Sequence, residues 1–280
     1  MFGREYSNHI DTLTYSLGEI NEKYKGKIKK TNNKGLIGQL KKLYISVFGI
    51  PEIGFQLRCL YFDKILNSYL LKEAPKKILD AGCGIGTYTL LLGKMFEKAK
   101  IMGVDIDKKK LQTCKMLANE LNIKNTAFAY FDVTKKQMET SYDLIVNIDV
   151  LEHIDRYEAV LENFSNLLKR GGYLYIHVPQ SNQERIFGSL KEWHHEDHAR
   201  EGISRKILED DLRKLGFKII VSRETFGLFG KLSWELNHLA LAKSFFIVGV
   251  IFPILYIIAK IDLWQNNKNG LGIALLAKKE

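Results

Sequence analysis

Residues 77–93 read KILDAGCGIGTYTLLLG, and this stretch decides the fold. A short apolar run precedes three alternate glycines, Gly82, Gly84 and Gly86, and a leucine-rich run follows them. The pattern predicts a buried strand, a tight turn and then a helix. Glycines at such a turn let a ligand come close to backbone N–H groups. The stretch therefore predicts a ligand-binding turn at the first core strand of an α/β sheet.

The spacing of the three glycines separates this turn from two other glycine-rich loops. The dinucleotide fingerprint G-x-G-x-x-G would need a glycine at position 87, where this chain has Thr87. A P-loop would continue into Gly-Lys-Ser/Thr, which does not follow here. The spacing counts against NAD or FAD as the ligand and excludes a P-loop nucleotide site.

Strand-like and helix-like segments alternate along the chain after Pro75. We expect strands at residues 76–82, 99–107, 126–133, 142–149, 171–179, 217–225 and 271–279. The helices expected between them cover residues 87–96, 108–121, 156–170 and 204–216, the last with Ser204 as its N-cap. Such alternation predicts a mainly parallel sheet covered by helices on both faces, with its ligand beyond the carboxyl ends of the strands.

Two further regions lie outside this alternation. Residues 1–75 comprise a lysine-rich lead-in and, from residue 35, two or three amphipathic helices broken at Pro51. We expect this part to be an N-terminal helical cap on a domain of residues 76–280. Insertions interrupt that domain at about 180–203, which is rich in histidine, and at 228–265, which is apolar and predicted to be helical.

Three aspartates fall at the ends of the first three predicted core strands. Asp105 follows Gly82 by 23 residues, where a carboxylate can accept hydrogen bonds from both hydroxyls of a ribose. Asp132 can accept from an exocyclic amine such as that of adenine, and Asp80 is placed to meet an amino-bearing group. Each aspartate alone is also explained as a helix cap or a loop residue, but the set favours a nucleoside ligand.

The motifs as a set resemble those of the class I S-adenosylmethionine-dependent methyltransferases, closest to the type 11 small-molecule group. They are ILDAGCGIGTYTLLL, GVDID, YFDV, YDLIVNIDVLEHI and LKRGGYLYIHVP, within residues 76–227, together with the last strand. The resemblance implies a Rossmann-like three-layer α/β sandwich. Its seven-stranded sheet is mainly parallel, and the last strand is antiparallel and inserted beside the fifth.

The resemblance also implies the residues that would contact S-adenosylmethionine. They are Asp80, Gly82, Cys83, Gly84, Gly86, Asp105, Ile106, Asp132, Val133, Asn147 and Ile148. By position, the glycines would line the methionine and ribose part, and Asp105 would bind the ribose hydroxyls beside Ile106 on the adenine. Asp132 would bind the adenine amine, and Asn147, Ile148 and Asp80 would lie at the methionine end. No metal is expected.

The acceptor side is less clearly marked, because methyl transfer needs a base only when the acceptor must lose a proton. Two stretches offer candidates, DVLEHIDR at residues 149–156 and EWHHEDHAREG at residues 192–202. The catalytic candidates are His153, His195 and His198, and the substrate candidates are Asp149, Trp193 and Arg200. Local hydrogen bonding remains the alternative for each, and the histidine spacing does not match a metal site.

Composition and motifs narrow the class of acceptor. The net charge of +10 suggests an anionic partner or simply a lysine-rich composition. The Asp/Asn-Pro-Pro-aromatic turn of adenine-N6 enzymes is absent, since residues 147–150 read NIDV. Cytosine-carbon enzymes need a nucleophilic cysteine, and the cysteine near this site is Cys83, among the glycines. No basic-aromatic recognition module is evident, so nucleic acid is not the expected partner.

An uncharged segment, residues 244–259, lies between Lys243 and Lys260. A span usually needs about 20 apolar residues, and Gly249 and Pro253 interrupt this one. If the strands on either side belong to one sheet, the chain must return to the side that it left. We therefore expect an interfacial hairpin on an anionic membrane, a lid over the substrate, or a helix pair buried in the core or in a homodimer.

These observations lead to one expected function and several rivals. We expect a methyltransferase that moves a methyl group to oxygen or nitrogen of a small-molecule or lipid- or glycan-linked acceptor. The rivals are an inactive cofactor-binding pathway protein, an RNA methyltransferase and an NAD-type oxidoreductase. Three cysteines without a CxxC spacing favour the cytoplasm, with peripheral contact at the inner face of the membrane as an extension.

Overall fold

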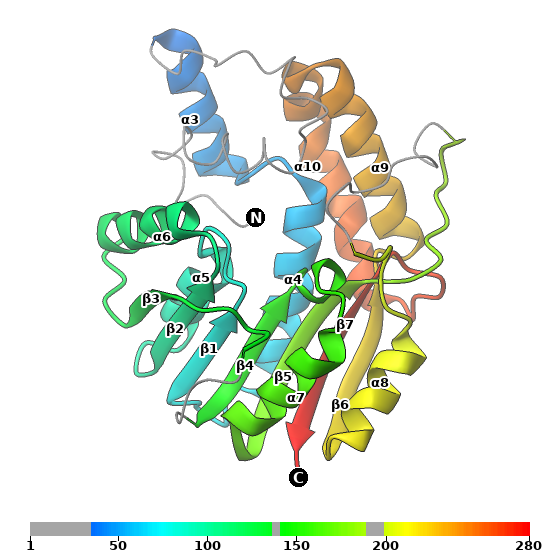
Figure 1. Cartoon of the computed structure of the whole chain (residues 1–280). Coiled ribbons are helices and arrows are strands. Elements are labelled where there is room, and N and C mark those ends of the chain that lie inside the picture. Colours follow the sequence, from blue (N-terminus) through cyan, green and yellow to red (C-terminus); the bar gives the residue numbers. More distant parts are fainter. Residues whose placement is uncertain (1–34, 136–140, 189–198) are drawn as a thin grey trace. The chain divides into compact units, whose positions relative to one another are not determined.

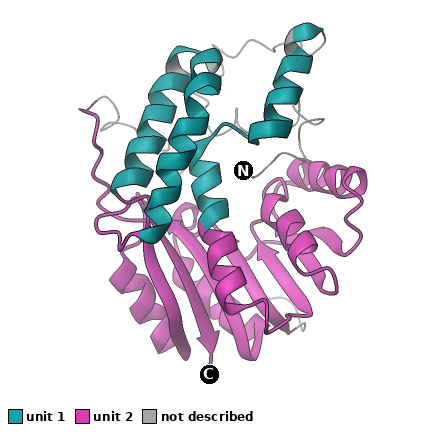
Figure 2. Ribbon diagram, turned by 180° about the vertical axis from the view of Figure 1, so that it is seen from behind, with its two compact units in different colours: residues 1–60, 228–264 teal, residues 61–227, 265–280 magenta. Residues whose placement is uncertain are grey.

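The computed structural model describes residues 35–135, 141–188 and 199–280 (Figure 1). The chain forms two compact units, coloured separately in Figure 2. Unit 1 comprises residues 1–60 and 228–264, and unit 2 comprises residues 61–227 and 265–280. The apolar insertion thus groups with the N-terminal segment, whereas the sequence interpretation drew a boundary at residue 75.

Unit 2 is built on a sheet of seven strands in the order β3-β2-β1-β4-β5-β7-β6. The strands are β1 Lys77–Ala81, β2 Lys100–Asp105, β3 Thr126–Tyr130, β4 Tyr142–Ile148, β5 Leu168–Pro179, β6 Phe217–Thr225 and β7 Gly272–Lys279. Strands β1 to β5 pair in parallel, and β7 runs antiparallel between β5 and β6. The expected sheet and its antiparallel last strand are confirmed.

Four helices and a short 3-10 turn accompany this sheet. They are α5 Thr87–Met95, α6 Lys108–Glu120, η2 Leu151–His153, α7 Tyr157–Leu167 and α8 Arg205–Lys214. Ser204 caps α8 as expected, because its hydroxyl accepts a hydrogen bond from the Ile207 N–H at 3.3 Å. Three boundaries differ from the prediction by three residues. Strand β3 ends at Tyr130 rather than at residue 133, and α7 ends at Leu167 rather than at residue 170. Strand β5 begins at Leu168 rather than at residue 171, since Leu168 is buried and pairs with Tyr142 of β4.

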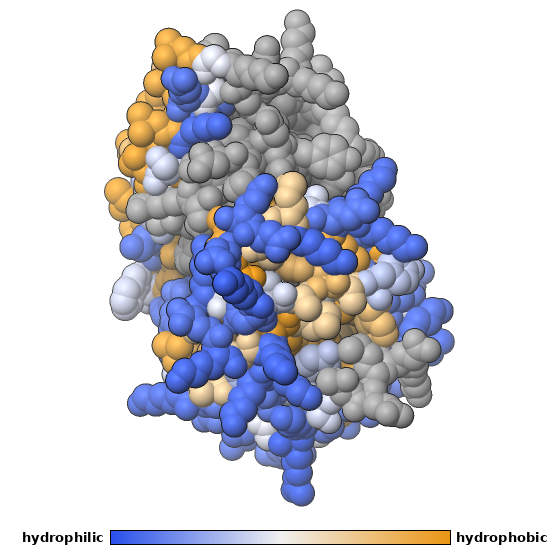
Figure 3. Space-filling model, turned by 90° about the vertical axis from the view of Figure 1, so that its left-hand side faces the viewer, coloured by the Kyte–Doolittle hydropathy of each residue, from blue (hydrophilic) through white to orange (hydrophobic). Residues whose placement is uncertain are grey.

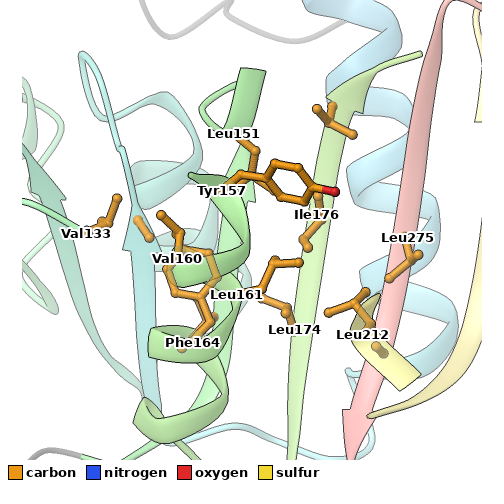
Figure 4. Close-up of a cluster of buried hydrophobic side chains, with 14 of the residues drawn as sticks. Val133, Leu151, Tyr157, Val160, Leu161, Phe164, Leu174, Ile176, Leu212 and Leu275 are labelled. Atoms are coloured by element: carbon orange, nitrogen blue, oxygen red, sulfur yellow. The ribbon is translucent and has the colours of Figure 1, made fainter. Parts of the chain in front are cut away.

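Helices cover both faces of the sheet. Figure 4 shows Leu161 and Phe164 of α7 and Leu174 of β5 within one buried apolar cluster. Leu79 of β1 belongs to the same cluster, whereas its neighbour Asp80 bonds to α5. Successive side chains of a strand point to opposite faces, so α7 and α5 lie on opposite sides of the sheet. Burying each large apolar side chain contributes about 1.5–3 kcal/mol, and the result is the expected three-layer sandwich.

Unit 1 is helical and contains the expected N-terminal helices. Its elements are α3 Leu36–Phe48, the start of α4 Ile53–Tyr69, α9 Leu228–Lys243, α10 Phe245–Ile261 and η4 Asp262–Trp264. Asn237 of α9 accepts a hydrogen bond from the Ile53 N–H at 3.2 Å and donates to the Pro51 carbonyl at 3.4 Å. Both partners lie at the start of α4, whose first N–H groups have no partner within the helix. Helix α9 therefore fixes the start of α4.

Candidate active site

The glycine turn lies at the switch point of the sheet, where β1 has β2 on one side and β4 on the other. Gly82, Gly84 and Gly86 have φ values of +81°, +54° and +83°, a region that residues with a side chain rarely adopt. The turn then enters α5, with Gly86 as its N-cap. The three glycines are thus required by the backbone itself.

The space around the glycines differs from one to the next. A Cβ on Gly82 would lie 2.4 Å from Cγ2 of Val150, so the turn after β4 packs directly on this loop. A Cβ on Gly86 would lie 3.0 Å from the sulfur of Cys114. At Gly84, by contrast, no described atom lies within 4 Å of the Cβ position. Gly84 is therefore where a ligand can approach the backbone.

Asp105 is held in place by two backbone hydrogen bonds. Its Oδ2 accepts from the Gly84 N–H at 2.8 Å, and its Oδ1 accepts from the Asp107 N–H at 2.9 Å. Each carboxylate oxygen can accept a second hydrogen bond. The carboxylate thus ties the second strand to the glycine loop. Its expected contact with the ribose hydroxyls stays a prediction.

Asp80 is buried directly before the glycine turn. Its Oδ2 accepts a hydrogen bond at 2.6 Å from the hydroxyl of Thr89, a buried residue of α5. Burial raises the pKa of Asp80 to about 7, against the opposing effect of the Thr89 hydrogen bonds. The carboxyl is therefore poised between its two charge states near neutral pH, and a nearby cationic amino group would favour ionisation.

Cys83 is a buried thiol rather than a reactive one. A hydrogen bond with the Cys114 thiol, and then burial, raise the pKa of Cys83. Cys114 in turn donates to the Gly84 carbonyl at 3.2 Å. Because the thiolate is the nucleophilic form of cysteine, Cys83 is unsuited to covalent catalysis. Its expected contact with the cofactor stays a prediction.

Asp132 lies two residues beyond the end of β3, in the turn that follows the strand. Its Oδ1 accepts from the Thr134 hydroxyl at 2.6 Å and from the Thr134 N–H at 3.0 Å. The Thr134 hydrogen bond lowers the pKa of Asp132. The Asn163 amide holds the adjacent Val133 carbonyl at 2.9 Å. Asp132 is thus an ionised turn residue, and its expected contact with adenine stays a prediction, as does that of the exposed Ile106.

Asn147 brings an unsatisfied acceptor to the end of β4. Its side chain is fully buried, and its amide donates to the Ala81 carbonyl at 2.8 Å. Within the described part of the chain, the buried Oδ1 has no hydrogen-bond partner. An orphaned buried acceptor beside the glycine turn fits a ligand that brings a donor, such as an amino group. With the open space at Gly84 and the oriented Asp105, it fits the expected cofactor.

The next turn carries Asp149, which has a left-handed backbone at φ +53°. Its N–H donates to the His177 carbonyl at 2.9 Å, and its Oδ1 lies 2.7 Å from His177 Nδ1. The other ring nitrogen of His177 lies 3.1 Å from the Thr225 hydroxyl. His177 and Thr225 are buried, whereas the Asp149 side chain is 25% exposed. The histidine is thus a buried support behind a carboxylate that reaches the surface.

The sequence interpretation missed His177 and Thr225. The available signal was a lone histidine within the apolar run LYIHVP of β5. Gly272 of β7 leaves room for these two side chains. A Cβ at this position would lie only 2.7 Å from the Thr225 hydroxyl and 3.2 Å from the His177 ring. Three strands therefore cooperate to hold Asp149. An ionised carboxylate only accepts hydrogen bonds, so with Asp149 in that form the donor between the two side chains is His177 Nδ1–H.

Arg200 holds the loop that follows this turn through backbone hydrogen bonds and a ring contact. Its Nη2 donates to the Ile154 carbonyl at 3.1 Å and to the Asp155 carbonyl at 2.6 Å. Its guanidinium also lies over the Tyr157 ring, 4.7 Å from the centroid. These contacts hold the loop between η2, where His153 is exposed, and α7. A direct contact of Arg200 or His153 with substrate remains a prediction.

Three candidates from the histidine-rich stretch lie outside the described residues, namely Trp193, His195 and His198. In the ranges that are described, no group of three or more His, Cys, Asp or Glu side chains is arranged to hold a metal ion.

Known proteins resemble this chain in sequence and in fold. A family described as "Methyltransferase domain" matches residues 72–215. Among curated relatives, (S)-coclaurine N-methyltransferase of Papaver somniferum is 27% identical over 40% of this chain and 33% of its own length. Phosphoethanolamine N-methyltransferase 1 of Triticum aestivum is 27% identical over 71% of this chain and 41% of its length. The chain thus spans about a third to two fifths of these two relatives.

Solved structures show the same fold at low identity. Coclaurine N-methyltransferase bound to N-methylheliamine and S-adenosylhomocysteine superposes with a TM-score of 0.54 at 18% identity, over 78% of this chain and 71% of that one. The [4+2]-cyclase SpnF gives a TM-score of 0.54 at 16% identity, over 78% and 81% of the two chains. The second structure shows that the same fold serves a protein named for a different reaction.

Proposed function

This chain belongs to the class I S-adenosylmethionine-dependent methyltransferases, and we propose that it methylates an amine or hydroxyl of a small or lipid-linked acceptor. The observation that carries the proposal is the position of Asp149. Its turn packs on the glycine loop through Val150, and buried His177 holds its carboxylate from behind. A carboxylate beside the cofactor loop is suited to bind the proton-bearing group of an acceptor.

The residues of the cofactor half have separate tasks in this proposal. S-adenosylmethionine supplies a methyl group on a sulfonium, which is activated for in-line displacement. Asp105 would hold the ribose, the open side of Gly84 would admit the ligand, and the Asn147 Oδ1 would accept a hydrogen bond from its amino group. The protein then contributes alignment of the acceptor and exclusion of water, which are the main needs of this reaction.

On the acceptor side, we assign to Asp149 the binding of the acceptor and the removal of its proton. A carboxylate attracts an ammonium and accepts a hydrogen bond from an amine or a hydroxyl. The His177 Nδ1–H keeps one carboxylate oxygen fixed, and the Thr225 hydroxyl fixes the other side of the ring. His153 is a second candidate for proton transfer, since it is exposed at the end of η2.

Replacement of Asp149 by Asn tests this assignment. We expect kcat for transfer of labelled methyl groups to fall by about 10²–10⁴-fold, because the amide cannot take a proton. The affinity for S-adenosylhomocysteine should stay within about twofold of the wild-type value, because the role proposed for Asp149 is to bind the acceptor and not the cofactor. The substrate pool is a metabolite and lipid extract incubated with labelled cofactor.

Asp210→Asn is the matched control, because Asp210 forms a surface ion pair with Arg213 on α8 at 3.0 Å. Such pairs contribute little to stability, so this variant should retain full activity. Full activity of Asp149→Asn would remove Asp149 from the mechanism. Cofactor binding with no labelled product from any extract would instead favour a second function, that of a cofactor-binding protein without methyl transfer. The [4+2]-cyclase SpnF has the same fold and is named for a different reaction.

A further inference from the structure

The outer face of α10 is apolar and exposed along its whole length. Val250, Ile254 and Ile257 are 61%, 62% and 64% exposed, and Trp264 just beyond the helix is 83% exposed. The spacing of four, three and seven residues places these side chains on one stripe of the helix. In a helix surrounded by water, this stripe would carry polar residues.

The opposite face of α10 is packed against the protein, so the helix as a whole is not detached. Val248, Phe252 and Ala259 of α10 are fully buried. The helix is therefore apolar all round, with one face in the protein interior and the other outside. Figure 3 shows hydrophobic residues reaching the molecular surface. Large exposed apolar patches of this kind mark interaction sites.

Helix α3 carries a second stripe of the same kind in the same unit. Leu36, Leu40, Leu43 and Val47 are exposed and recur at spacings of four, three and four residues. Lys41 and Lys42 lie within the same helix. The helix thus has the amphipathic character of segments that lie in a membrane interface.

A specific contact joins α3 to α10. Pro253 has no N–H, so the carbonyl of Gly249, four residues earlier, loses its normal partner within the helix. The Tyr44 hydroxyl of α3 donates to this carbonyl at 2.6 Å, and burial raises the pKa of Tyr44 to about 12. The proline therefore creates the acceptor by which α3 docks. The Tyr44 hydrogen bond thus joins the two helices that carry the apolar stripes.

The sheet topology excludes a single crossing of a membrane. The stretch Phe246–Trp264 is long and apolar enough to span by length and composition alone. However, β6 and β7 are neighbours in one sheet, and both flank the α9–α10 hairpin in the sequence. The chain must then leave and return on the same side. Helix α9 does not offer a second lipid-facing span, since its Lys231, Glu235 and Asn237 are buried in the protein.

Charge identifies the partner of this surface. In the sequence, residues 23–42 contain eight lysines and no acidic residue: Lys23, Lys25, Lys27, Lys29, Lys30, Lys34, Lys41 and Lys42. Of these, Lys41 and Lys42 lie in the described helix α3, and the other six precede the described residues. Lys243 and Lys260 lie at the two ends of the uncharged part of α10. Clusters of four to eight basic residues beside an amphipathic helix are typical of binding to anionic lipids.

We propose that the exposed stripes of α3 and α10 insert into one leaflet of an anionic lipid bilayer. A second copy of the chain is a poorer partner, because a two-fold interface would bring these lysine-bordered faces together. Trp264 is suited to the headgroup boundary, where tryptophan is enriched. The inference goes beyond methyl transfer, and with the proposed function it names the acceptor class: a molecule dissolved in or anchored to that leaflet.

Flotation of the full-length protein with vesicles tests the proposal without any turnover. We expect binding to vesicles of phosphatidylcholine with about 30% phosphatidylglycerol, and weaker binding to phosphatidylcholine alone or at high salt. The triple variant Val250→Gln, Ile254→Gln, Ile257→Gln should bind the anionic vesicles at least about tenfold more weakly. The control is Ile207→Gln, an isoleucine 53% exposed on α8, which should bind as the wild type does.

Two further measurements keep the outcomes separate. Calorimetry with S-adenosylhomocysteine shows whether the triple variant is folded and still binds the cofactor. If the wild-type chain does not bind S-adenosylhomocysteine, the proposed function is contradicted but the membrane proposal is not. In the wild-type chain, lipids brominated near the headgroup should quench tryptophan fluorescence, and Trp264→Phe should remove most of that quenching. Undiminished flotation of the triple variant would overturn the proposal. So would a wild-type dimer that ignores vesicles and becomes monomeric in the triple variant.

Discussion

At the scale of single residues, the site combines groups that the motifs reveal with groups that only the fold brings together. The glycines and Asp105 were readable because their chemistry requires fixed positions next to strand ends. The contact between His177 and Thr225 could not be predicted from the sequence. It forms only because β7 pairs with β5 on one side and with β6 on the other. The two residues lie 48 positions apart, and the sequence between them carries no sign of that register.

Asp80 gives a pH-dependent prediction at this scale. Burial raises its pKa to about 7 in the folded chain, whereas an unfolded aspartate titrates near about 3.9. Between these values the folded state holds the extra proton, so Asp80 makes the free energy of unfolding fall as pH rises. The slope is at most about 1.4 kcal/mol per pH unit. Denaturant unfolding from about pH 5 to about pH 7 should therefore show a flatter profile for Asp80→Asn than for the wild type, and equal slopes would refute the assignment.

At the scale of elements, the sequence predicted the strands and helices of unit 2 closely, and the misses have physical causes. The start of β5 was placed too late because LKRGG has a helix-like beginning and two glycines, yet Leu168 pairs with β4. The docking of α3 on α10 through Tyr44 and Gly249 joins residues 205 positions apart. No local pattern encodes such a contact, because Pro253 leaves the Gly249 carbonyl without a helical partner but does not determine which side chain binds it.

The strand-to-helix turn at Gly84 gives a prediction at this second scale. Gly84→Ala adds a methyl group where no described atom lies within 4 Å, at φ +54°. Folding should lose only about 1–2 kcal/mol from the left-handed backbone. Binding of S-adenosylhomocysteine should weaken at least about tenfold, because the methyl group occupies ligand space.

Gly216→Ala is the matched control for that strain. Gly216 also has a left-handed backbone, at φ +80°, and no described atom lies within 4 Å of its Cβ position. It follows α8, away from the switch point of the sheet. This variant should lose similar stability in thermal unfolding and keep its cofactor affinity. Equal loss of affinity in both variants would mean that backbone strain, rather than the loss of open space for the ligand at Gly84, explains the effect.

At the scale of the whole molecule, the chain combines a methyltransferase unit with a helical unit assembled from two distant parts of the sequence. The first was predictable because its motifs are tied to one cofactor. The second was recognised only as apolar and helical, since nothing local joins residues 35–60 to residues 228–264. The acceptor side remains the least predictable part, because three of its candidates, Trp193, His195 and His198, lie outside the described residues.

The most direct measurement of the central claim is calorimetric titration with S-adenosylhomocysteine, with NADH in parallel. We predict binding of S-adenosylhomocysteine alone. Asp105→Ala should weaken it about ten- to a hundredfold, since a hydrogen bond to a charged group is worth about 1.5–3 kcal/mol. Binding of NADH without S-adenosylhomocysteine, or unchanged affinity in Asp105→Ala, would contradict the account.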